Sequence, residues 1–98
     1  MFKLQFSPRA KQELASVLEY LEAQWGEKTR LKFEKKLVQR LDMMAQMPHS
    51  FPKSPTNKLV RKTVLIKQVS IFFSVSQTHV NILSFFDNRQ NPSKLNDI

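Results

Sequence analysis

The sequence contains no cysteine and only one glycine, and each shortage excludes a class of function. Without cysteine the chain cannot build a disulfide scaffold, a zinc ribbon or a thiol nucleophile. Phosphate-cradling loops and dinucleotide-binding fingerprints need several glycines close together, so a single glycine excludes both. The lack of cysteine also fits a reducing compartment such as the cytosol.

Long apolar runs are missing as well. The longest apolar burst, Ile71–Val75, has the length of a strand, whereas a membrane span needs about 20 apolar residues. The first residues, Met1–Pro8, do not contain the apolar run of a secretory signal. We therefore expect a soluble, cytoplasmic protein that has no membrane partner.

Few residues are available for metal or hydrolytic chemistry. The two histidines, His49 and His79, do not stand at the spacing from each other or from carboxylates that metal ligands need. Neither histidine belongs to a recognisable nucleophile–base–acid motif. We expect no metal, no cofactor and no small-molecule substrate.

Positive charge, by contrast, is plentiful. Sixteen lysines and arginines against eight acidic residues give a net charge of +8. The excess is larger in residues 48–98, where seven basic residues stand against two acidic ones. Such a balance is typical of a chain that binds a polyanion or an acidic partner, and the alternative is a charge that only keeps a small domain in solution.

The N-terminal half predicts a strand and a helix within one domain, which we expect to span residues 1–98. Residues 1–6 alternate apolar and polar side chains, and this period of two predicts a half-buried strand. Ser7 and Pro8 are the residues expected at a helix N-cap and first position, and Gly26 is expected just past the helix end. The apolar stripe of this helix, from Pro8 to Trp25, consists of Ala10, Leu14, Val17, Leu18, Leu21 and Trp25.

A second helix is predicted from Glu27 to Gln46, because apolar residues recur at helical spacing until Pro48 stops it. Its apolar stripe is Phe33, Leu37, Leu41 and Met44, widened by Val38, Ala45 and Leu31. Its other face carries six cations, which are Lys28, Arg30, Lys32, Lys35, Lys36 and Arg40. The short connection at Gly26 predicts an antiparallel helical hairpin, and two apolar stripes require a sheet beneath them.

The C-terminal half predicts strands. Residues 48–57 hold three prolines and are expected to form a loop. The period then changes to two, which predicts strands at residues 59–66, 69–75 and 80–86 joined by short hairpin connections, with residues 88–98 as an irregular tail. The predicted fold class is α+β, in the order β-α-α-β-β-β, with the helical hairpin packed on a small antiparallel sheet.

Basic residues around the predicted sheet are the candidates for binding a target or a nucleic acid. They are Lys58, Arg61, Lys62, Arg89 and Lys94. Guanidinium and ammonium groups bind phosphates or acidic side chains through charge-assisted hydrogen bonds. Because neighbouring strands reverse direction, Arg61 near the start of the first of these strands and Arg89 after the last need not lie far apart. The alternative is that these cations are solvated residues at the rim of the sheet.

Several features of the chain follow one another in an order known from one superfamily. They are Phe6–Ala10 after the first strand, Tyr20 in the first helix, Met47–Pro48 at the end of the second, Arg61 at the start of the later strands and Asn88–Pro92 after them. In these features the chain resembles the RelE/ParE toxins of type II toxin–antitoxin modules over nearly its whole length. The resemblance implies a cognate antitoxin that wraps around the toxin, and an acidic wrapping segment would suit the charge of this chain.

The two branches of that superfamily differ in mechanism. RelE-like members cut mRNA on the ribosome with basic residues and a C-terminal tyrosine or histidine, whereas ParE-like members lack this set and inhibit DNA gyrase. In this sequence Ser70 stands at the position of a catalytic arginine, Asp87 where a histidine is common, and Leu95 about where a tyrosine falls. Without those groups RNA cleavage loses its acid–base catalyst and much of its phosphate stabilisation, so the resemblance favours a ParE-like toxin.

Other functions stay open at this point. The main alternative is a ribosome-dependent mRNA endonuclease in which Arg61 and Arg89 are the catalytic candidates. A basic nucleic-acid-binding domain without toxicity, or a module that has lost its activity, would also fit the charge.

Overall fold

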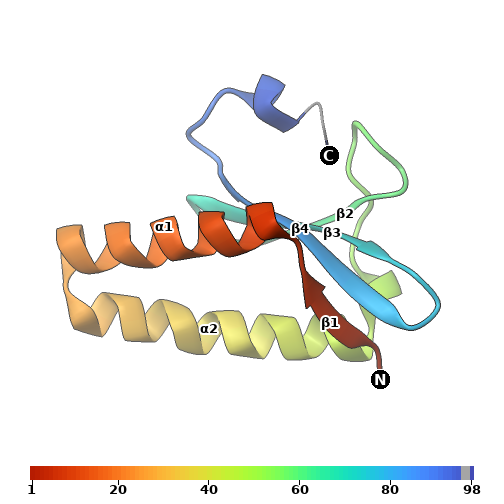
Figure 1. Ribbon diagram of the computed structural model, residues 1–98, viewed down its shortest axis with the longest axis horizontal. Helices are drawn as coiled ribbons and strands as arrows, with labels where there is room; N and C mark the ends of the chain where they lie inside the picture. Colours follow the sequence, from red (N-terminus) through yellow and green to blue (C-terminus); the bar gives the residue numbers. More distant parts are fainter. Residues whose placement is uncertain (96–97) are drawn as a thin grey trace.

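Two helices and four strands follow one another in the predicted order. The structure is a computed structural model, and it describes residues 1–95 and 98. Its elements are β1 (Lys3–Phe6), α1 (Pro8–Trp25), α2 (Glu27–Gln46), β2 (Arg61–Ile66), β3 (Val69–Val75) and β4 (His79–Asp87), with short 3-10 helices at Pro48–Ser50 and Pro92–Leu95. Figure 1 shows α1 and α2 as a hairpin along one side of the sheet. Neither helix of the described chain combines the length and hydropathy needed to span a membrane.

The sheet is mixed rather than wholly antiparallel. Its strand order is β1-β4-β3-β2, and β2, β3 and β4 form the predicted antiparallel meander, but β1 pairs with β4 in parallel. The helical hairpin brings the chain back to the end of the sheet where β1 starts, and there the backbone N–H of Phe2 donates to the carbonyl of Ala45 at 2.9 Å. β2 starts level with Phe6, the last residue of β1, and both β2 and β4 run in the direction of β1.

The ends of α1 form as the sequence predicts. The Ser7 hydroxyl oxygen accepts a hydrogen bond from the backbone N–H of Ala10 at 3.0 Å, and its hydroxyl donates to the carbonyl of Leu83 at the same distance. The N-cap therefore also fixes the start of α1 on β4. At the other end Gly26 has φ 93° and ψ 172°, a backbone region that is almost restricted to glycine.

Replacing Gly26 with alanine should lower the free energy of unfolding by about 1–3 kcal/mol, the usual cost of such a backbone conformation. A Cβ atom at this position would meet nothing within 4 Å, so the cost comes from the backbone alone. Urea denaturation would measure it, with the exposed Gln24→Ala in the last turn of α1 as the control. Equal effects of the two substitutions would contradict this explanation.

The main core lies between the hairpin and the sheet. It is built from Ala10, Leu21, Phe33, Leu37, Met44, Leu65, Val69, Ile71, Phe73, Val80, Ile82 and Phe85. Three residues of the predicted apolar stripes are exposed instead: Trp25 at 67%, Leu31 at 48% and Val38 at 65%. Trp25 lies in the last turn of α1, where the hairpin extends beyond the sheet (Figure 1), and Leu31 and Val38 lie on the side of α2 that turns away from the core.

A β-bulge in β4 connects the sheet to α1. Phe72 pairs with Ser84 and Phe73 with Ile82, so Leu83 is the extra residue of β4. The bulge lets both Ile82 and Phe85 point into the main core, although they are three positions apart in the sequence. The Glu13 carboxylate of α1 accepts hydrogen bonds from the Ser84 hydroxyl at 2.7 Å and from the backbone N–H of Phe85 at 3.2 Å.

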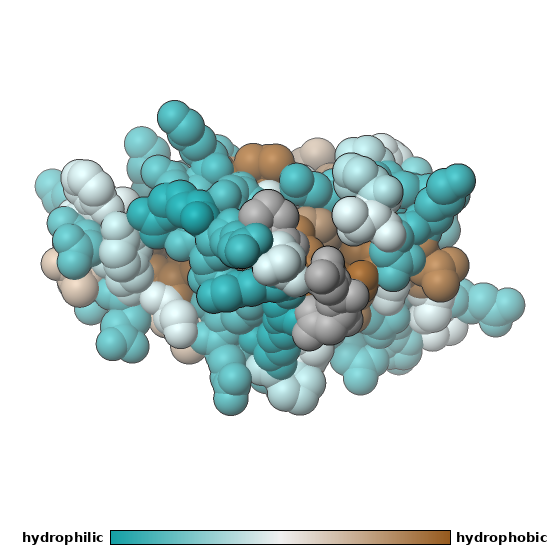
Figure 2. All heavy atoms as spheres, turned by 90° about the horizontal axis from the view of Figure 1, so that it is seen from above, coloured by the Kyte–Doolittle hydropathy of each residue, from teal (hydrophilic) through white to brown (hydrophobic). Residues whose placement is uncertain are grey.

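The other face of the sheet carries a smaller core that the C-terminal segment covers. Val60, Phe72 and Phe86 are buried there, and the partly buried Leu83, Leu95 and Ile98 pack against them. The predicted irregular tail therefore includes a 3-10 helix at Pro92–Leu95, while residues 96–97 lie outside the described chain. Figure 2 shows this side of the molecule as mostly hydrophilic, with apolar atoms in view beside the residues drawn in grey.

β2 is two residues shorter at its start than the predicted strand at residues 59–66, because a turn precedes it. The Asn57 side-chain oxygen accepts from the backbone N–H of Leu59 at 2.9 Å, and its backbone carbonyl accepts from Val60 at 3.0 Å. This turn keeps Leu59 and Val60 out of the ladder, so β2 starts at Arg61. Lys53 pairs with Arg61 as an isolated bridge on the free side of β2.

Candidate functional site

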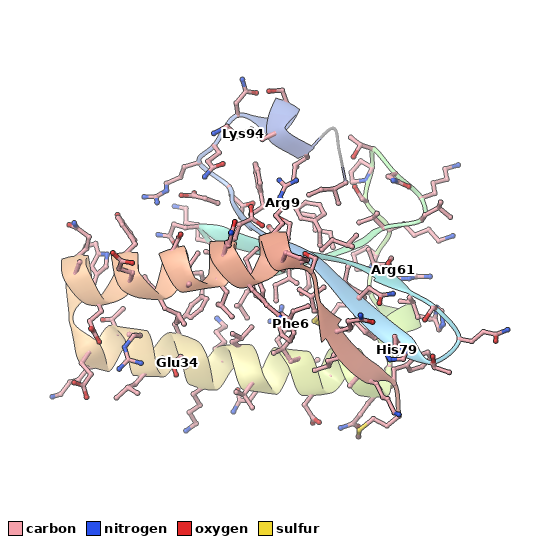
Figure 3. All side chains as sticks on the ribbon, viewed as in Figure 1. Phe6, Arg9, Glu34, Arg61, His79 and Lys94 are labelled. Carbon is pink, nitrogen blue, oxygen red and sulfur yellow. The ribbon has the colours of Figure 1, made fainter. Side chains whose placement is uncertain are left out.

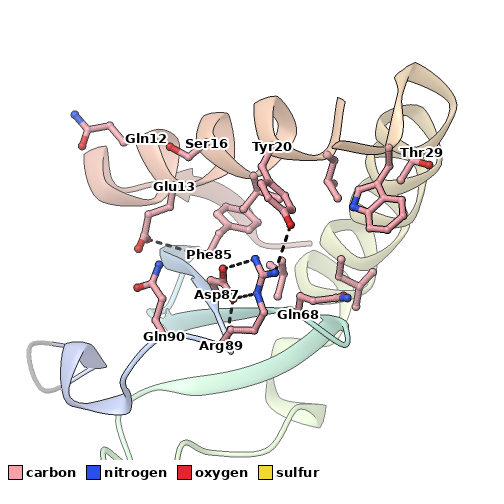
Figure 4. A pocket seen from close by; sticks show the side chains of 15 residues that line it. Gln12, Glu13, Ser16, Tyr20, Thr29, Gln68, Phe85, Asp87, Arg89 and Gln90 are labelled. Atoms are coloured by element: carbon pink, nitrogen blue, oxygen red, sulfur yellow. Dashed lines mark hydrogen bonds and ion pairs between the residues drawn. The ribbon is translucent and has the colours of Figure 1, made fainter. Parts of the chain in front are cut away.

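A groove runs beneath α1, between the helix and the end of the sheet where β3 starts and β4 stops. Its volume is about 770 Å³, within the usual range for ligand-binding clefts. Figure 4 shows α1 above the groove and the β4 end below it. The lining residues are Gln12, Glu13, Ser16, Val17, Tyr20, Leu21, Trp25, Thr29, Ile66, Gln68, Val69, Phe85, Asp87, Arg89 and Gln90.

The floor of the groove is apolar and two large aromatic side chains stand at its side. Leu21, Val69 and Phe85 at the floor belong to the main core. Tyr20 is 43% exposed and Trp25 is 67% exposed. Large aromatic side chains that remain exposed beside an apolar cleft are typical of a binding surface, because they gain much from being covered.

An ion pair closes the polar side of the groove. Arg89 Nη2 and Nε donate to the two carboxylate oxygens of Asp87 at 2.8 and 3.0 Å, and the guanidinium carbon lies 5.3 Å from the centre of the Tyr20 ring. The hydrogen bond from Arg89 holds the pKa of Asp87 below its ordinary value, and the same bond raises the pKa of Arg89. Both groups therefore stay charged at neutral pH, and neither is suited to move a proton in catalysis.

The composition of the groove suits the binding of a peptide. The described residues include no group of three histidine or acidic side chains that could hold a metal ion. The groove offers an apolar floor, two aromatic side chains and one fixed arginine, which together fit an amphipathic peptide segment with an acidic or carbonyl group near Arg89.

Arg61 is occupied in holding the loop that precedes β2. Its Nη1 donates to the carbonyl of Phe51 at 2.6 Å and lies 3.4 Å from the carbonyl of His49, and Nη2 lies 3.5 Å from the Nδ1 atom of the His49 ring. The next residue, Lys62, has its ammonium 5.7 Å from the centre of the Phe72 ring. Arg61 thus has a structural role at the base of the loop.

Arg61 and Arg89 do not converge. Arg61 pairs with Phe73 near the end of β3, whereas Asp87, two residues before Arg89, pairs with Val69 at the start of β3. The expectation that the two arginines need not be far apart was wrong. β2 and β4 run in the same direction, so Arg61 at the start of β2 and Arg89 beyond the end of β4 lie toward opposite ends of β3. The step of four positions from Phe73 to Val69 corresponds to about 13 Å of strand.

The remaining candidates lie outside the groove. Lys58 is exposed in the turn before β2, and Lys94 is exposed in the 3-10 helix of the C-terminal segment, where Figure 3 labels it. The backbone carbonyl of Lys94 accepts a hydrogen bond from Arg9 at 3.2 Å. Of the five predicted cations, the structure therefore brings only Arg89 into the groove.

Ser70, Asp87 and Leu95, which the sequence resemblance sets apart from the nucleolytic branch, make structural contacts. Ser70 is fully buried and its hydroxyl donates to the Asn88 side-chain oxygen at 2.9 Å. Asp87 is paired with Arg89, and Leu95 packs on the smaller core. These are the positions at which the sequence resemblance implies an arginine, a histidine and a tyrosine in nucleolytic members.

The sequence did not indicate the groove or its two aromatic residues. Trp25 was placed in the apolar stripe of α1, and its spacing does fit the stripe. The one signal in the sequence that could have indicated its exposure was its position in the last turn before Gly26. A side chain at the end of a helix is the first to lose its cover when the sheet beneath the helix is short.

One known protein family and several solved structures resemble most of the chain. A family model described as "ParE toxin of type II toxin-antitoxin system, parDE" matches residues 4–92. Among solved structures, the chromosomal ParDE system from P. aeruginosa is 20% identical with a TM-score of 0.74, covering 89% of this chain and 96% of that one. The YoeB dimer from Staphylococcus aureus is 16% identical with a TM-score of 0.63, covering 87% and 94%.

A third solved structure, the E. coli DinJ–YafQ complex, is 7% identical with a TM-score of 0.54 and covers 98% of this chain and 99% of that one. These identities establish a shared fold and no more. No curated protein matches the chain.

Proposed function

Because the chain belongs to the ParE toxin family of type II toxin–antitoxin systems, we propose that it arrests growth by binding an essential cytoplasmic target, with DNA gyrase as the family precedent, and that its cognate antitoxin neutralises it. The proposal treats the protein as an inhibitor that acts by binding. Cleavage of mRNA is the alternative that the experiment below separates from it.

The observation that carries the proposal is the identity of the side chains at Ser70, Asp87 and Leu95. A buried hydroxyl, a carboxylate paired with arginine and an apolar side chain supply neither a general acid or base nor a cation for a phosphate. Arg61 could replace little of this, because its guanidinium is bound to the carbonyl of Phe51.

The groove under α1 supports a specific site for the antitoxin. An amphipathic segment of the antitoxin would cover Tyr20 and Trp25 with its apolar side and place an acidic group near Arg89. The net charge of +8 favours an acidic partner and speeds its association.

The predicted cations outside the groove are proposed to contact the target. Lys58 and Lys94 are exposed, and Lys62 is half-buried over Phe72. Arg89 would contribute to the antitoxin site rather than to this set, and Arg61 would act indirectly by holding the loop that carries Lys58.

Induced expression in a bacterial host tests the proposed mode of action. Incorporation of labelled thymidine, uridine and methionine is followed separately over minutes, and we expect thymidine incorporation to fall first while methionine incorporation continues. Co-expression of the antitoxin should restore all three, which confirms that the arrest comes from the toxin. If methionine incorporation falls first and cut mRNA accumulates, the protein is an endonuclease and the proposal is wrong.

A further inference from the structure

One side of α2 carries a regular row of cations that the proposed function does not use. Lys28, Lys32, Lys36 and Arg40 follow one another at intervals of four residues. The three lysines are exposed and Arg40 is half-buried. Because a helix rises 1.5 Å per residue, neighbouring members are about 6 Å apart along the axis and the row is about 18 Å long.

Few acidic residues lie near the row to balance its charge. Within residues 1–95 and 98, no ion pair involves any of the three lysines. Of the three acidic residues in α2, Glu27 precedes Lys28 at the start of the helix, Glu34 is bound by Arg30, and Asp42 accepts a hydrogen bond from Gln46. Beyond the helix, the sequence from Met43 to Phe86 contains no acidic residue at all.

This spacing works against the stability of the helix. Like charges four residues apart repel one another, and the row contains three such pairs in succession. Elsewhere in the hairpin the same interval joins opposite charges, as in Arg9–Glu13 and Arg30–Glu34. A locally unfavourable row that the chain nevertheless contains is the kind of feature expected at a functional surface.

Arg40 fixes one end of the row on the sheet. Its Nη1 donates to the carbonyl of Val64 at 2.8 Å and also to the Thr63 hydroxyl. Each step of four residues turns the side chain by about 40° around the axis, so the row winds from the outside of α2 toward the edge of β2. Figure 3 shows α2 along the side of the molecule away from Lys94, with many side chains pointing outward into solvent.

We propose that the row from Lys28 to Arg40 is a binding surface for the phosphate backbone of duplex DNA. Beside its members the strip carries Lys35, Thr29 and Gln39, with the exposed apolar Leu31 and Met43 at its margins, so cations predominate and favour a polyanion as the partner. The cations follow a gradual turn around the helix at axial intervals of about 6 Å, and a duplex presents about ten phosphate charges over the roughly 18 Å of the row. The surface lies outside the groove lining apart from Thr29, and the inference goes beyond the proposed function.

Fluorescence anisotropy with a labelled 20-base-pair duplex tests this proposal on the purified chain at several salt concentrations. Four engaged cations predict a slope of log affinity against log salt of about −3.6, which corresponds to roughly a 100-fold loss of affinity between 50 and 200 mM salt. The triple variant Lys28→Gln, Lys32→Gln, Lys36→Gln should reduce the slope to about −0.9. Its thermal midpoint should be unchanged or higher, because the substitutions relieve the repulsion within the row.

The control is Lys11→Gln, Lys53→Gln, Lys67→Gln, which removes the same charge from exposed lysines away from the row. It should keep most of the slope of the original chain. The proposal is overturned if the control loses as much slope as the row variant, if a single-stranded RNA of equal length binds more tightly than the duplex, or if no salt-dependent binding occurs. None of these outcomes depends on how the protein arrests growth, so this proposal and the proposed function can fail separately.

Discussion

Replacing both Tyr20 and Trp25 with alanine is expected to weaken the complex with the cognate antitoxin by about 100-fold or more. Both aromatic side chains stand exposed beside the apolar floor of the groove under α1. A central aromatic residue of an interface typically contributes at least 2 kcal/mol when truncated, and about 1.4 kcal/mol corresponds to a tenfold change in affinity. Titration calorimetry with the purified antitoxin would measure the loss.

The matched control is the pair Leu31→Ala and Val38→Ala. These residues are also large, apolar and exposed, at 48% and 65%, but they lie on the side of α2 away from the groove. The control pair should change the affinity less than threefold. If both double variants bind the antitoxin with the affinity of the original chain, the antitoxin uses another surface and the proposed site is wrong.

The same two residues mark the limit of what the sequence could predict about the site. The apolar stripe of α1 identifies Trp25 as a core residue, and only the length of the sheet relative to the hairpin decides that it is exposed (Figure 1). Arg89 was predicted as a binding residue and lies in the groove. Its contact with Tyr20 could not be predicted, because Tyr20 is 69 residues away along the chain.

The fold was more accessible because local signals determine most of it. Ser7 caps the start of α1 and Gly26 ends it, as the side chain of the one and the backbone freedom of the other predict. In β3 the alternation of the sequence places Ile71 and Phe73 on one face of the sheet and Phe72 on the other. The parallel pairing of β1 with β4 has no local signal. It follows from the direction in which the helical hairpin returns the chain, which depends on long-range contacts such as that between Phe2 and Ala45.

The bulge at Leu83 was also beyond reach from the sequence, and it has consequences for the site. A strict period of two through β4 would put Ile82 and Phe85 on opposite faces, yet both belong to the main core. The extra residue makes this possible and leaves polar groups near Phe85 that need a partner. Glu13, which also lines the groove, is that partner.

Replacing Glu13 with leucine should therefore lower the free energy of unfolding by about 2–4 kcal/mol. The Glu13 carboxylate is the acceptor for the Ser84 hydroxyl, a fully buried residue, and for the backbone N–H of Phe85. An unsatisfied buried donor costs about 1–3 kcal/mol. Glu13→Gln is the matched control, because its amide oxygen can still accept both hydrogen bonds, and it should cost less than about 1 kcal/mol.

Urea denaturation of both variants would measure the difference, and hydrogen exchange would locate it at the amide of Phe85, which should exchange faster in the leucine variant only. Because Glu13 and Phe85 both line the groove, the leucine variant should also bind the antitoxin more weakly, whereas the glutamine variant should not. Equal stability of the two variants would mean that the negative charge, including its pairing with Arg9, matters more than the two hydrogen bonds. The faster exchange at Phe85 is the result that links the stability of the bulge to the shape of the groove.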